Sequence, residues 1–398
     1  MNDGKDKKVM KITDFMQRNN GVFKDTKVLS EGYIPDKFLF REDEISKIIR
    51  NINAYLDEIP PNNMFIYGPP STGKTHILMA ISNVLNEYSM KEGANSRYIY
   101  INTGKKTLPQ VLVSIAESLG INAVINQGPS IFDRIKKKLN GNYFFIFDEF
   151  DRIEPTEGHS NPYNFIVNVF TRIGSNVRIA CVLNDVKILK KFDDATLSSY
   201  SPQKLYFRPY NAQEITEILK DRCSKAFEEG VIDEEVVAEF GAFIYKSGID
   251  LRTALKILLT AGRNAEGGKI SMKDLKVSFM EVEQNIIKEI ISNLNDTELL
   301  FTYAIAISQH KYRSREIEKN IVYKMYQNVC NEFDYPTLSW RHLSTRIATG
   351  LEKQGIIRSE VHGRGKGKGT ATFFSIDDGV ELDEIIKVTN EELKRRVI

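Results

Sequence analysis

The stretch GPPSTGKT, residues 68–75, restricts the possible folds of this chain more than any other segment. It has the spacing G-x-x-x-x-G-K-T, follows the strand-like segment 62–67 and precedes a segment with helical periodicity. A loop in that position turns its backbone N–H groups inward at a helix N-terminus, which favours phosphate binding. We expect Lys74 to reach the β- and γ-phosphates of a nucleotide and the Thr75 hydroxyl to bind Mg²⁺.

An acidic pair, Asp148 and Glu149, follows the continuous apolar run 143–147. Such a run is typical of a central strand that is covered on both faces. Taken alone, the pair is equally consistent with the cap of a following helix. Because a phosphate loop lies upstream, we interpret Asp148 as a ligand of Mg²⁺ through its water shell. Glu149 is then the group that polarises the attacking water.

Residues 177–183 form another predicted strand, which ends at Asn184. The Asn184 amide is a candidate to orient the water beside Glu149, although an Asn-Asp pair alone indicates only a turn. Further strands are predicted at 97–101 and 204–207, and helices at 108–119, 130–139 and 161–173. This alternation predicts an α/β fold with a parallel sheet and helices on both faces. Ligands bind at the carboxyl ends of such strands, so we expect one site to collect these features.

After residues 208–210 the pattern becomes helical, with segments 212–229, 233–245 and 251–265 joined by short loops. These segments predict a small helical domain. Arg252 lies in the first turn of its last helix, where a cation opposes the helix dipole. A nearby phosphate would explain this position, and an ordinary surface arginine is the alternative.

The C-terminal part, from about residue 294, contains three predicted helices followed by two short strands. The helices cover 295–308, 314–332 and 340–354, and the strands cover 355–361 and 370–376. This order is that of a winged helix, a relative of the helix-turn-helix. Residues 311–368 hold twelve Lys and Arg against six Asp and Glu, although the whole chain has a net charge of only +2. Such local charge suggests nucleic acid, and a solvated basic face is the alternative.

The third helix and the glycine-rich stretch 363–369 supply the candidate DNA contacts. Leu343, Ile347 and Leu351 are predicted to face inward. The polar positions then predict a recognition helix for the major groove, formed by Arg341, His342, Ser344, Thr345 and Arg346. The tip of the wing is predicted to grip phosphate or to enter the minor groove through Arg364, Lys366 and Lys368. A flexible linker and a protein-interaction module remain open alternatives.

The three cysteines, Cys181, Cys223 and Cys330, are too widely spaced to indicate a disulfide framework or a zinc knuckle. Residues 1–10 are polar, and the chain has no apolar run of about 18 residues. We therefore expect a soluble, intracellular protein with no membrane partner.

The order of GPPSTGKT, FDEFD, Asn184 and Arg252 resembles that of AAA+ ATPases. More closely, it resembles the archaeal replication initiators of the origin-recognition and cell-division-control family. GYIPD at 32–36 and FRE at 40–42 resemble the family's segment on the adenine side of the nucleotide. FRPY at 207–210 and ILKDR at 218–222 resemble the family's junction between sheet and lid. IDLRTAL at 249–255 resembles the family's second sensor, with Arg252 in the arginine position.

The resemblance implies an AAA+ α/β domain at 31–207 after an N-terminal extension at 1–30, a helical lid at 208–290 and a winged-helix DNA-binding domain at 291–398. The implied cofactors are ATP or ADP, with Mg²⁺ on Thr75 and Asp148. Glu149, Asn184 and Arg252 are the expected catalytic residues. The expected nucleotide-binding residues are Tyr33, Ile34, Gly68, Pro69, Pro70, Ser71, Thr72, Gly73, Lys74, Thr75, His76, Tyr210, Ile218 and Arg252.

The implied function is ATP-regulated recognition of double-stranded origin DNA at the start of replication, with slow ATP hydrolysis, in the nucleoid-associated cytoplasm. Paralogous initiator subunits and the replicative helicase are the implied further partners. Three alternatives stay open: an AAA+ motor of the helicase or clamp-loader type, a protein that holds ADP as a structural element, and a winged-helix transcription regulator.

Two positions depart from the family pattern. Ser71 occupies a position where the family most often has glycine, and Ala195 stands where it usually has an arginine that reaches a neighbour's nucleotide. Loss of such an arginine costs ~10³–10⁵ in rate where one is used, so stimulation by an identical neighbour is not expected. Segment 120–140 coincides with a helical insertion of the family. Its basic residues Arg134, Lys136, Lys137 and Lys138 are consistent with a DNA contact or with a basic surface helix.

Overall fold

The computed structural model describes residues 21–55, 59–124, 128–155, 161–174, 176–265, 268–363, 370–377 and 381–397. The chain divides into two compact units, one up to Leu275 and one from Lys276. None of the helices in these described ranges combines the length and apolar character needed to cross a bilayer.

The first unit is built on a five-stranded parallel sheet with the strand order β2-β3-β4-β1-β5. The strands are β1 (Met64–Tyr67), β2 (Ser96–Asn102), β3 (Asn142–Asp148), β4 (Val177–Leu183) and β5 (Gln203–Tyr206). Because all five run in the same direction, their carboxyl ends share one edge of the sheet. That edge carries the start of the phosphate loop after β1, Asp148 at the end of β3 and Asn184 after β4. The predicted parallel α/β fold is confirmed.

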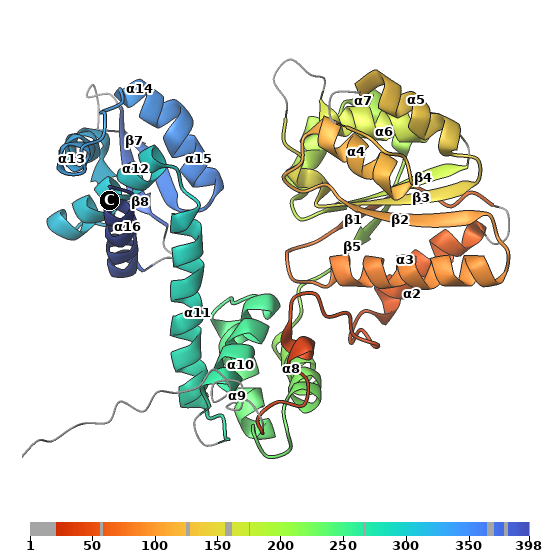
Figure 1. Cartoon of the computed structure of the whole chain (residues 1–398), viewed down its shortest axis with the longest axis horizontal. Helices are drawn as coiled ribbons and strands as arrows, with labels where there is room; N and C mark the ends of the chain where they lie inside the picture. The colour runs from red at the N-terminus through yellow and green to blue at the C-terminus, as the bar shows by residue number, and fades with distance from the viewer. Residues whose placement is uncertain are drawn as a thin grey trace, which may run out of the picture. The chain divides into compact units, whose positions relative to one another are not determined.

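Helices cover both faces of this sheet (Figure 1). One face carries α4 (Leu108–Ser118), α5 (Gly128–Lys138), α6 (Pro162–Arg172) and α7 (Asp194–Tyr200), and the other α2 (Glu42–Ile52) and α3 (Lys74–Lys91). Along β3, Phe145 and Phe147 enter the core on the first face, while Phe144 and Ile146 enter the core on the second. A strand buried on both sides needs apolar residues at every position, which explains the uninterrupted run that the sequence shows.

Three helices follow the sheet: α8 (Ala212–Ala226), α9 (Glu234–Lys246) and α10 (Leu251–Asn264). Asn211 and Glu214 form a capping box at the start of α8, and the Asp250 side chain caps α10. The segment upstream of the sheet packs against these helices. Phe23 stacks on Phe227, at the end of α8, with ring centroids 5.1 Å apart. Short 3₁₀ turns complete the unit at η2 (Thr26–Leu29), η3 (Asn53–Tyr55), η5 (Phe150–Arg152) and η6 (Val186–Lys191).

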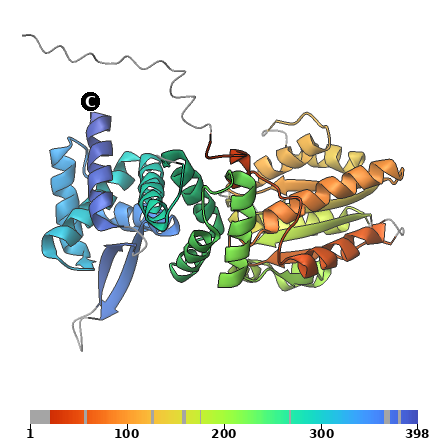
Figure 2. The same ribbon diagram turned by 90° about the horizontal axis from the view of Figure 1, so that it is seen from below.

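The second unit is a winged helix. After α11 (Met272–Ser292), it contains α12 (Asp296–Tyr312), α13 (Lys319–Glu332), a third helix made of α14 (Trp340–His342), the π-turn η7 (Leu343–Ile347) and α15 (Ala348–Lys353), and a last helix, α16 (Leu382–Val397). Its sheet has the order β6-β8-β7, with β6 (Ile317–Glu318), β7 (Ile357–Gly363) and β8 (Thr370–Ile376). Figure 2 shows the β7–β8 hairpin extending from the helices of this unit.

Two details of this unit differ from the prediction. The second helix, expected from residue 314, begins only at Lys319, because Ile317 and Glu318 pair with β8 as a third strand. The acidic segment after β8, for which no helix was predicted, contains α16. Eight of the 16 residues of α16 are charged, but Ile385, Val388 and Leu393 belong to the core of the unit.

Candidate functional site

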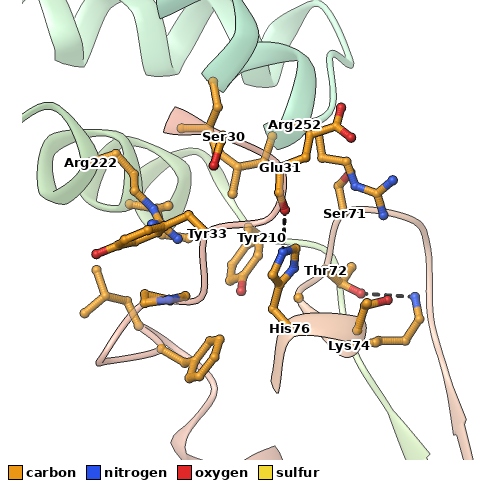
Figure 3. Close-up of a pocket in the computed structure, with 18 of the residues that line it drawn as sticks. Ser30, Glu31, Tyr33, Ser71, Thr72, Lys74, His76, Tyr210, Arg222 and Arg252 are labelled. Atoms are coloured by element: carbon orange, nitrogen blue, oxygen red, sulfur yellow. Dashed lines mark hydrogen bonds between the residues drawn. The ribbon is translucent and has the colours of Figure 1, made fainter. Parts of the chain in front are cut away.

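A pocket in the first unit collects the sequence features that predict nucleotide binding. Its walls come from the strap of residues 29–39, the phosphate loop, the ends of β3 and β4, and helices α8 and α10 (Figure 3). The predicted residues that line it are Tyr33, Ser71, Thr72, Gly73, Lys74, Thr75, His76, Asp148, Glu149, Asn184, Tyr210, Ile218 and Arg252. Ile34, Gly68, Pro69 and Pro70 are not among the lining residues. Gly68 faces the end of β5 instead, since a Cβ there would lie 2.1 Å from the Phe207 carbonyl oxygen.

The phosphate loop places a lysine in a buried position. Gly73 caps α3 with φ of 88°, a conformation that glycine adopts without strain. Lys74 is only 5 % exposed, and its Nζ donates to the carbonyl oxygens of Gly68 and Pro69, both at 2.7 Å. Burial lowers the pKa of Lys74 to about 8, although the charges of Asp148 and Asp151 act in the opposite direction.

Asp148 lies beside the phosphate loop and is 3 % exposed. Its Oδ2 accepts hydrogen bonds from the hydroxyls of Thr75 and Tyr100, both at 2.6 Å. Burial, followed by the negative charge of Asp148, raises the pKa of Tyr100, so this phenol remains a donor. The carboxylate of Asp148 and the hydroxyl of Thr75 are hard oxygen ligands, the kind that Mg²⁺ prefers. The residues present therefore fit a Mg²⁺ ion.

Glu149 follows in a left-handed backbone conformation, with φ of 51°. Its side chain pairs with Arg152, with 3.4 Å between Oε1 and Nη1. On the opposite side lies Gly104, where an added Cβ would be 1.8 Å from Glu149 Oε2. The glycine thus leaves the space that the Glu149 carboxylate occupies.

Asn184 is held at the same edge by Asp151. Oδ2 of Asp151 accepts the backbone N–H groups of Asn184 at 3.0 Å and of Asp185 at 2.9 Å. Because Asp151 lies two residues after Glu149, this contact ties the end of β4 to the end of β3. Both predicted water-directing side chains, Glu149 and Asn184, line the same pocket.

The strap and the lid supply the remaining walls. The Arg222 guanidinium stacks over the Tyr33 ring at 4.6 Å, and burial lowers the pKa of this arginine. His76 Nε2 lies 2.7 Å from the Glu31 carbonyl oxygen, so this nitrogen carries the proton. Aromatic and apolar groups on this side, including Tyr33, Tyr210 and Ile218, are suited to a flat base. Lys74 lies at the loop end of the pocket.

Arg252 lies in the first turn of α10, as predicted, and is exposed. Figure 3 shows it at the same side of the pocket as Ser71. Its positive charge contributes to the lowering of the Lys74 pKa, which indicates that both cations act on the same region. A phosphate between them would be stabilised by both.

The third helix of the winged-helix unit presents the candidate DNA contacts. Arg341, Thr345 and Arg346 are exposed, while His342 and Ser344 are half-buried. The hydroxyls of Ser344 and Thr345 donate to the Arg341 carbonyl at 3.2 and 2.7 Å. The two arginines are therefore the stronger candidates for base or phosphate contacts.

The opposite side of this helix packs inward as predicted. Leu343, Ile347 and Leu351 are buried, and Trp340 makes edge contacts with Phe301 and Phe374. Trp340 is thus part of the packing of this unit.

The wing consists of β7 and β8, paired from Ile357 and Ile376 to Gly363 and Thr370. Near its end, His362 Nε2 lies 3.0 Å from Glu316 Oε2, and the imidazole packs against Phe373. The predicted tip residues Arg364, Lys366 and Lys368 lie outside the described residues. In the other unit, Arg134, Lys136, Lys137 and Lys138 are exposed on α5, and Ala195 is exposed in the first turn of α7.

Residues 216–273 match the model of the Cdc6 AAA+ ATPase-type lid domain, and residues 289–385 match that of the CDC6 C-terminal winged helix domain. The ORC1-type DNA replication protein of Desulfurococcus amylolyticus is 29 % identical over 370 residues, covering 89 % of this chain and 93 % of the relative. These two stretches are therefore similar to the Cdc6-type lid and winged helix, and the chain as a whole is similar to ORC1-type DNA replication proteins.

Solved structures of two Aeropyrum pernix proteins share the fold. The Aeropyrum pernix ORC1 protein, solved in complex with DNA, superimposes with a TM-score of 0.82 at 24 % identity and covers 95 % of this chain and 99 % of its own. The Aeropyrum pernix ORC2 protein, solved as ADPNP–ADP complexes, matches with a TM-score of 0.58 at 19 % identity, over 95 % of this chain and 100 % of its own. The AAA+ architecture with a lid and a winged helix is therefore confirmed, and with it a nucleotide-binding ATPase fold.

Several residues that line the pocket were not predicted from the sequence. They are Leu29, Ser30, Glu31, Pro35, Lys37, Phe38, Leu39, Asp221, Arg222, Leu251 and Leu255. Most belong to the strap, which has no periodicity to mark an inward side. Asp221 and Arg222 lie in the stretch that resembles the junction of sheet and lid, so the resemblance was the available signal.

Arg41 was also not predicted as a residue of the site. It is completely buried, and its guanidinium donates to the carbonyl oxygens of Thr72 at 3.1 Å and of Arg208 at 2.6 Å. It also lies over the Tyr210 ring at 3.9 Å. Arg41 thus braces the phosphate loop against the junction between sheet and lid.

Proposed function

We propose that this protein is an ATP-regulated initiator of replication that binds double-stranded DNA at replication origins. The observation that carries the proposal is the combination, in one chain, of the pocket holding Lys74, Asp148 and Glu149 with a winged helix that exposes Arg341 and Arg346. The names of the relatives and the Aeropyrum pernix ORC1 protein solved with DNA support it.

In the proposed reaction, ATP binds with its phosphates at the N-terminus of α3 and on Lys74. Thr75 and Asp148 would hold a Mg²⁺ ion, which neutralises phosphate charge when bound. Glu149 accepts a proton from the attacking water, Asn184 orients that water, and Arg252 stabilises charge on the γ-phosphate. Turnover is slow, because Ala195 occupies the position of the arginine that would reach the nucleotide of a neighbouring subunit. An identical neighbour therefore supplies no such arginine.

In the proposed DNA complex, the third helix of the winged-helix unit lies in the major groove, and the wing contacts phosphates. The bound nucleotide controls the DNA-bound state. Paralogous initiator subunits and the replicative helicase are the further partners, and the nucleoid is the site of action.

Footprinting on the origin of the host genome tests the DNA part of this proposal. Arg346→Ala is expected to relax sequence selectivity, because a base contact contributes ~1–3 kcal/mol to discrimination. Lys366→Ala is expected to weaken binding without changing the preferred site. If neither change affects binding, the DNA assignment is wrong. Protection of promoters rather than the origin would instead favour a transcription regulator.

Glu149→Gln tests the ATPase part. Hydrolysis should fall ~10²–10⁴-fold, because the variant cannot accept the proton, while ATP affinity is retained. Single-turnover hydrolysis and calorimetric binding measure the two quantities. Vigorous turnover stimulated by DNA in the unmodified protein would favour a motor, and ADP that cannot be exchanged would favour a structural role for the nucleotide.

A further inference from the structure

The hydroxyl of Ser71 joins the phosphate loop to the lid. Ser71 Oγ donates to Oδ1 of Asp250 at 2.9 Å, over a separation of 179 positions in the sequence. The same carboxylate oxygen accepts the backbone N–H groups of Arg252 at 2.8 Å and Thr253 at 3.2 Å. One oxygen atom therefore connects the loop that faces phosphate with the turn that carries Arg252.

Ser71 makes this contact from an unfavourable backbone conformation. Its φ is 59°, in the left-handed region that glycine adopts at lower free energy than serine. The family resemblance predicts glycine at this position. Glycine would remove the backbone strain, but it would also remove the hydroxyl that donates to Asp250. Serine at this position therefore adds backbone strain and also adds a hydrogen bond to the lid.

Asp250 is a strong acceptor for this contact. Burial of its carboxyl acts to raise the pKa, but hydrogen bonds from Thr253, Ser71 and Arg252 outweigh it, and the pKa lies below the ordinary value. The carboxylate is thus ionised at neutral pH, and a hydrogen bond to an ionised group is stronger than a neutral one. Oδ2 accepts the Thr253 hydroxyl at 3.0 Å, which holds the carboxylate in a defined orientation.

We propose that Ser71 is a positioning residue, which acts through Asp250 to hold Arg252 toward the γ-phosphate and thereby increases the preference for ATP over ADP. The inference rests on the proposed function, because it requires ATP in this pocket. A pre-positioned arginine loses less conformational entropy when the γ-phosphate arrives. ADP lacks that phosphate, so its affinity depends less on Arg252.

The test compares the affinities of ADPNP and ADP by calorimetry. In Ser71→Gly and Ser71→Ala, the ratio of ADPNP affinity to ADP affinity should fall about fivefold to tenfold, the range for one ordinary hydrogen bond, because Ser71 acts on Arg252 only through Asp250. Asp250→Asn keeps one oxygen for Ser71 and the capped N–H groups, and asparagine also caps helices, but it removes the charge and the oxygen that accepts the Thr253 hydroxyl. Because the hydrogen bond from Ser71 then goes to a neutral group, the ratio should fall, but less than in Ser71→Gly.

Two further variants separate positioning from a general effect on the lid. Lys256→Ala breaks the 2.7 Å ion pair between Lys256 on α10 and Glu31 of the strap without touching Asp250, and the affinity ratio should not change. In an Arg252→Ala background, Ser71→Gly should cause no further loss, because residues that act through one another are not additive.

An unchanged ratio in Ser71→Gly, or an equal loss with and without Arg252, overturns the inference. Ser71→Gly relieves strain, so misfolding does not confound it, and its thermal melting curve checks this. Lys74→Ala distinguishes the two levels of the proposal: if it binds ADPNP as well as the unmodified protein does, the nucleotide site itself is wrong. If only Lys74→Ala loses binding, the site stands and the role of Ser71 fails.

Discussion

The two units hold their functional cations in opposite ways. In the first unit, Lys74 is 5 % exposed and its ammonium donates to two loop carbonyls. In the second, Arg341 and Arg346 extend from an exposed helix face. A buried charge interacts at low effective dielectric with a few fixed atoms, whereas water and salt screen an exposed one. We therefore expect single substitutions in the nucleotide pocket to cause large losses of ATP binding or hydrolysis. Substitutions at the DNA face should cause small, additive losses of DNA affinity.

The largest expected effect is that of Lys74→Ala on ATP binding. The variant loses the charged contacts to two phosphates, so ATP affinity should fall by roughly 100-fold or more in calorimetric titration. Lys91→Ala is the control, because Lys91 is exposed at the other end of the same helix. Retained ATP affinity in Lys74→Ala would show that the buried lysine does not bind the nucleotide.

Gly104→Ala should slow hydrolysis while leaving ATP binding intact. The new Cβ would overlap Glu149 Oε2 and displace the carboxylate from the attacking water. A displacement of about 1 Å at a catalytic group costs up to ~10²-fold in rate, so single-turnover hydrolysis should fall between tenfold and 100-fold. A rate equal to that of the unmodified protein would show that Glu149 is not confined by Gly104.

The buried lysine also predicts a pH dependence of ATP affinity. Burial lowers the pKa of Lys74 to about 8, so the ammonium loses its proton as the pH rises through this value. ATP affinity should then fall by up to about tenfold per pH unit above that value. Lys74→Met should lack this dependence.

The same pKa shift has the opposite effect on folding. Between the folded pKa of about 8 and the ordinary value of 10.5, the unfolded chain binds more protons at this residue than the folded chain does. The contribution of Lys74 to the free energy of unfolding should therefore rise with pH across that window. Denaturant unfolding of the unmodified protein and of Lys74→Met at several pH values measures it, and parallel curves would contradict the assignment.

The smallest expected effect is at the DNA face. Arg341→Ala should weaken duplex binding a few-fold and reduce the slope of affinity against salt by about 1, as loss of one phosphate contact does. Arg395→Ala is a control in the same unit, since Arg395 lies on α16, outside the third helix and the wing, and pairs with Glu392 at 2.7 Å. If the loss of duplex affinity in Arg341→Ala did not depend on salt, the arginine would not act as an exposed, screened charge, and the two units would not differ in this respect.

Much of the architecture could be predicted because its determinants are local. The apolar run before Asp148 predicted a strand buried on both faces, and the alternation of strands and helices predicted the parallel sheet. The winged helix followed from the order of three helices and two strands, and the spacing of Leu343, Ile347 and Leu351 predicted the buried side of its third helix. The short strand β6 was missed, because a pair of residues has no periodicity and becomes a strand only by pairing with β8.

The nucleotide site divides in the same manner. The sequence by itself determined the phosphate loop, the acidic pair and the positions of Asn184 and Arg252, since consecutive residues impose the backbone turn or end a strand. Only the tertiary structure decided the contacts of Arg41 with Thr72, of Asp151 with Asn184 and of Ser71 with Asp250, which join residues 31, 33 and 179 positions apart. The physical reason is that a hydrogen bond between distant residues depends on how the packed sheet and lid bring them together, and no local pattern in the chain encodes that distance.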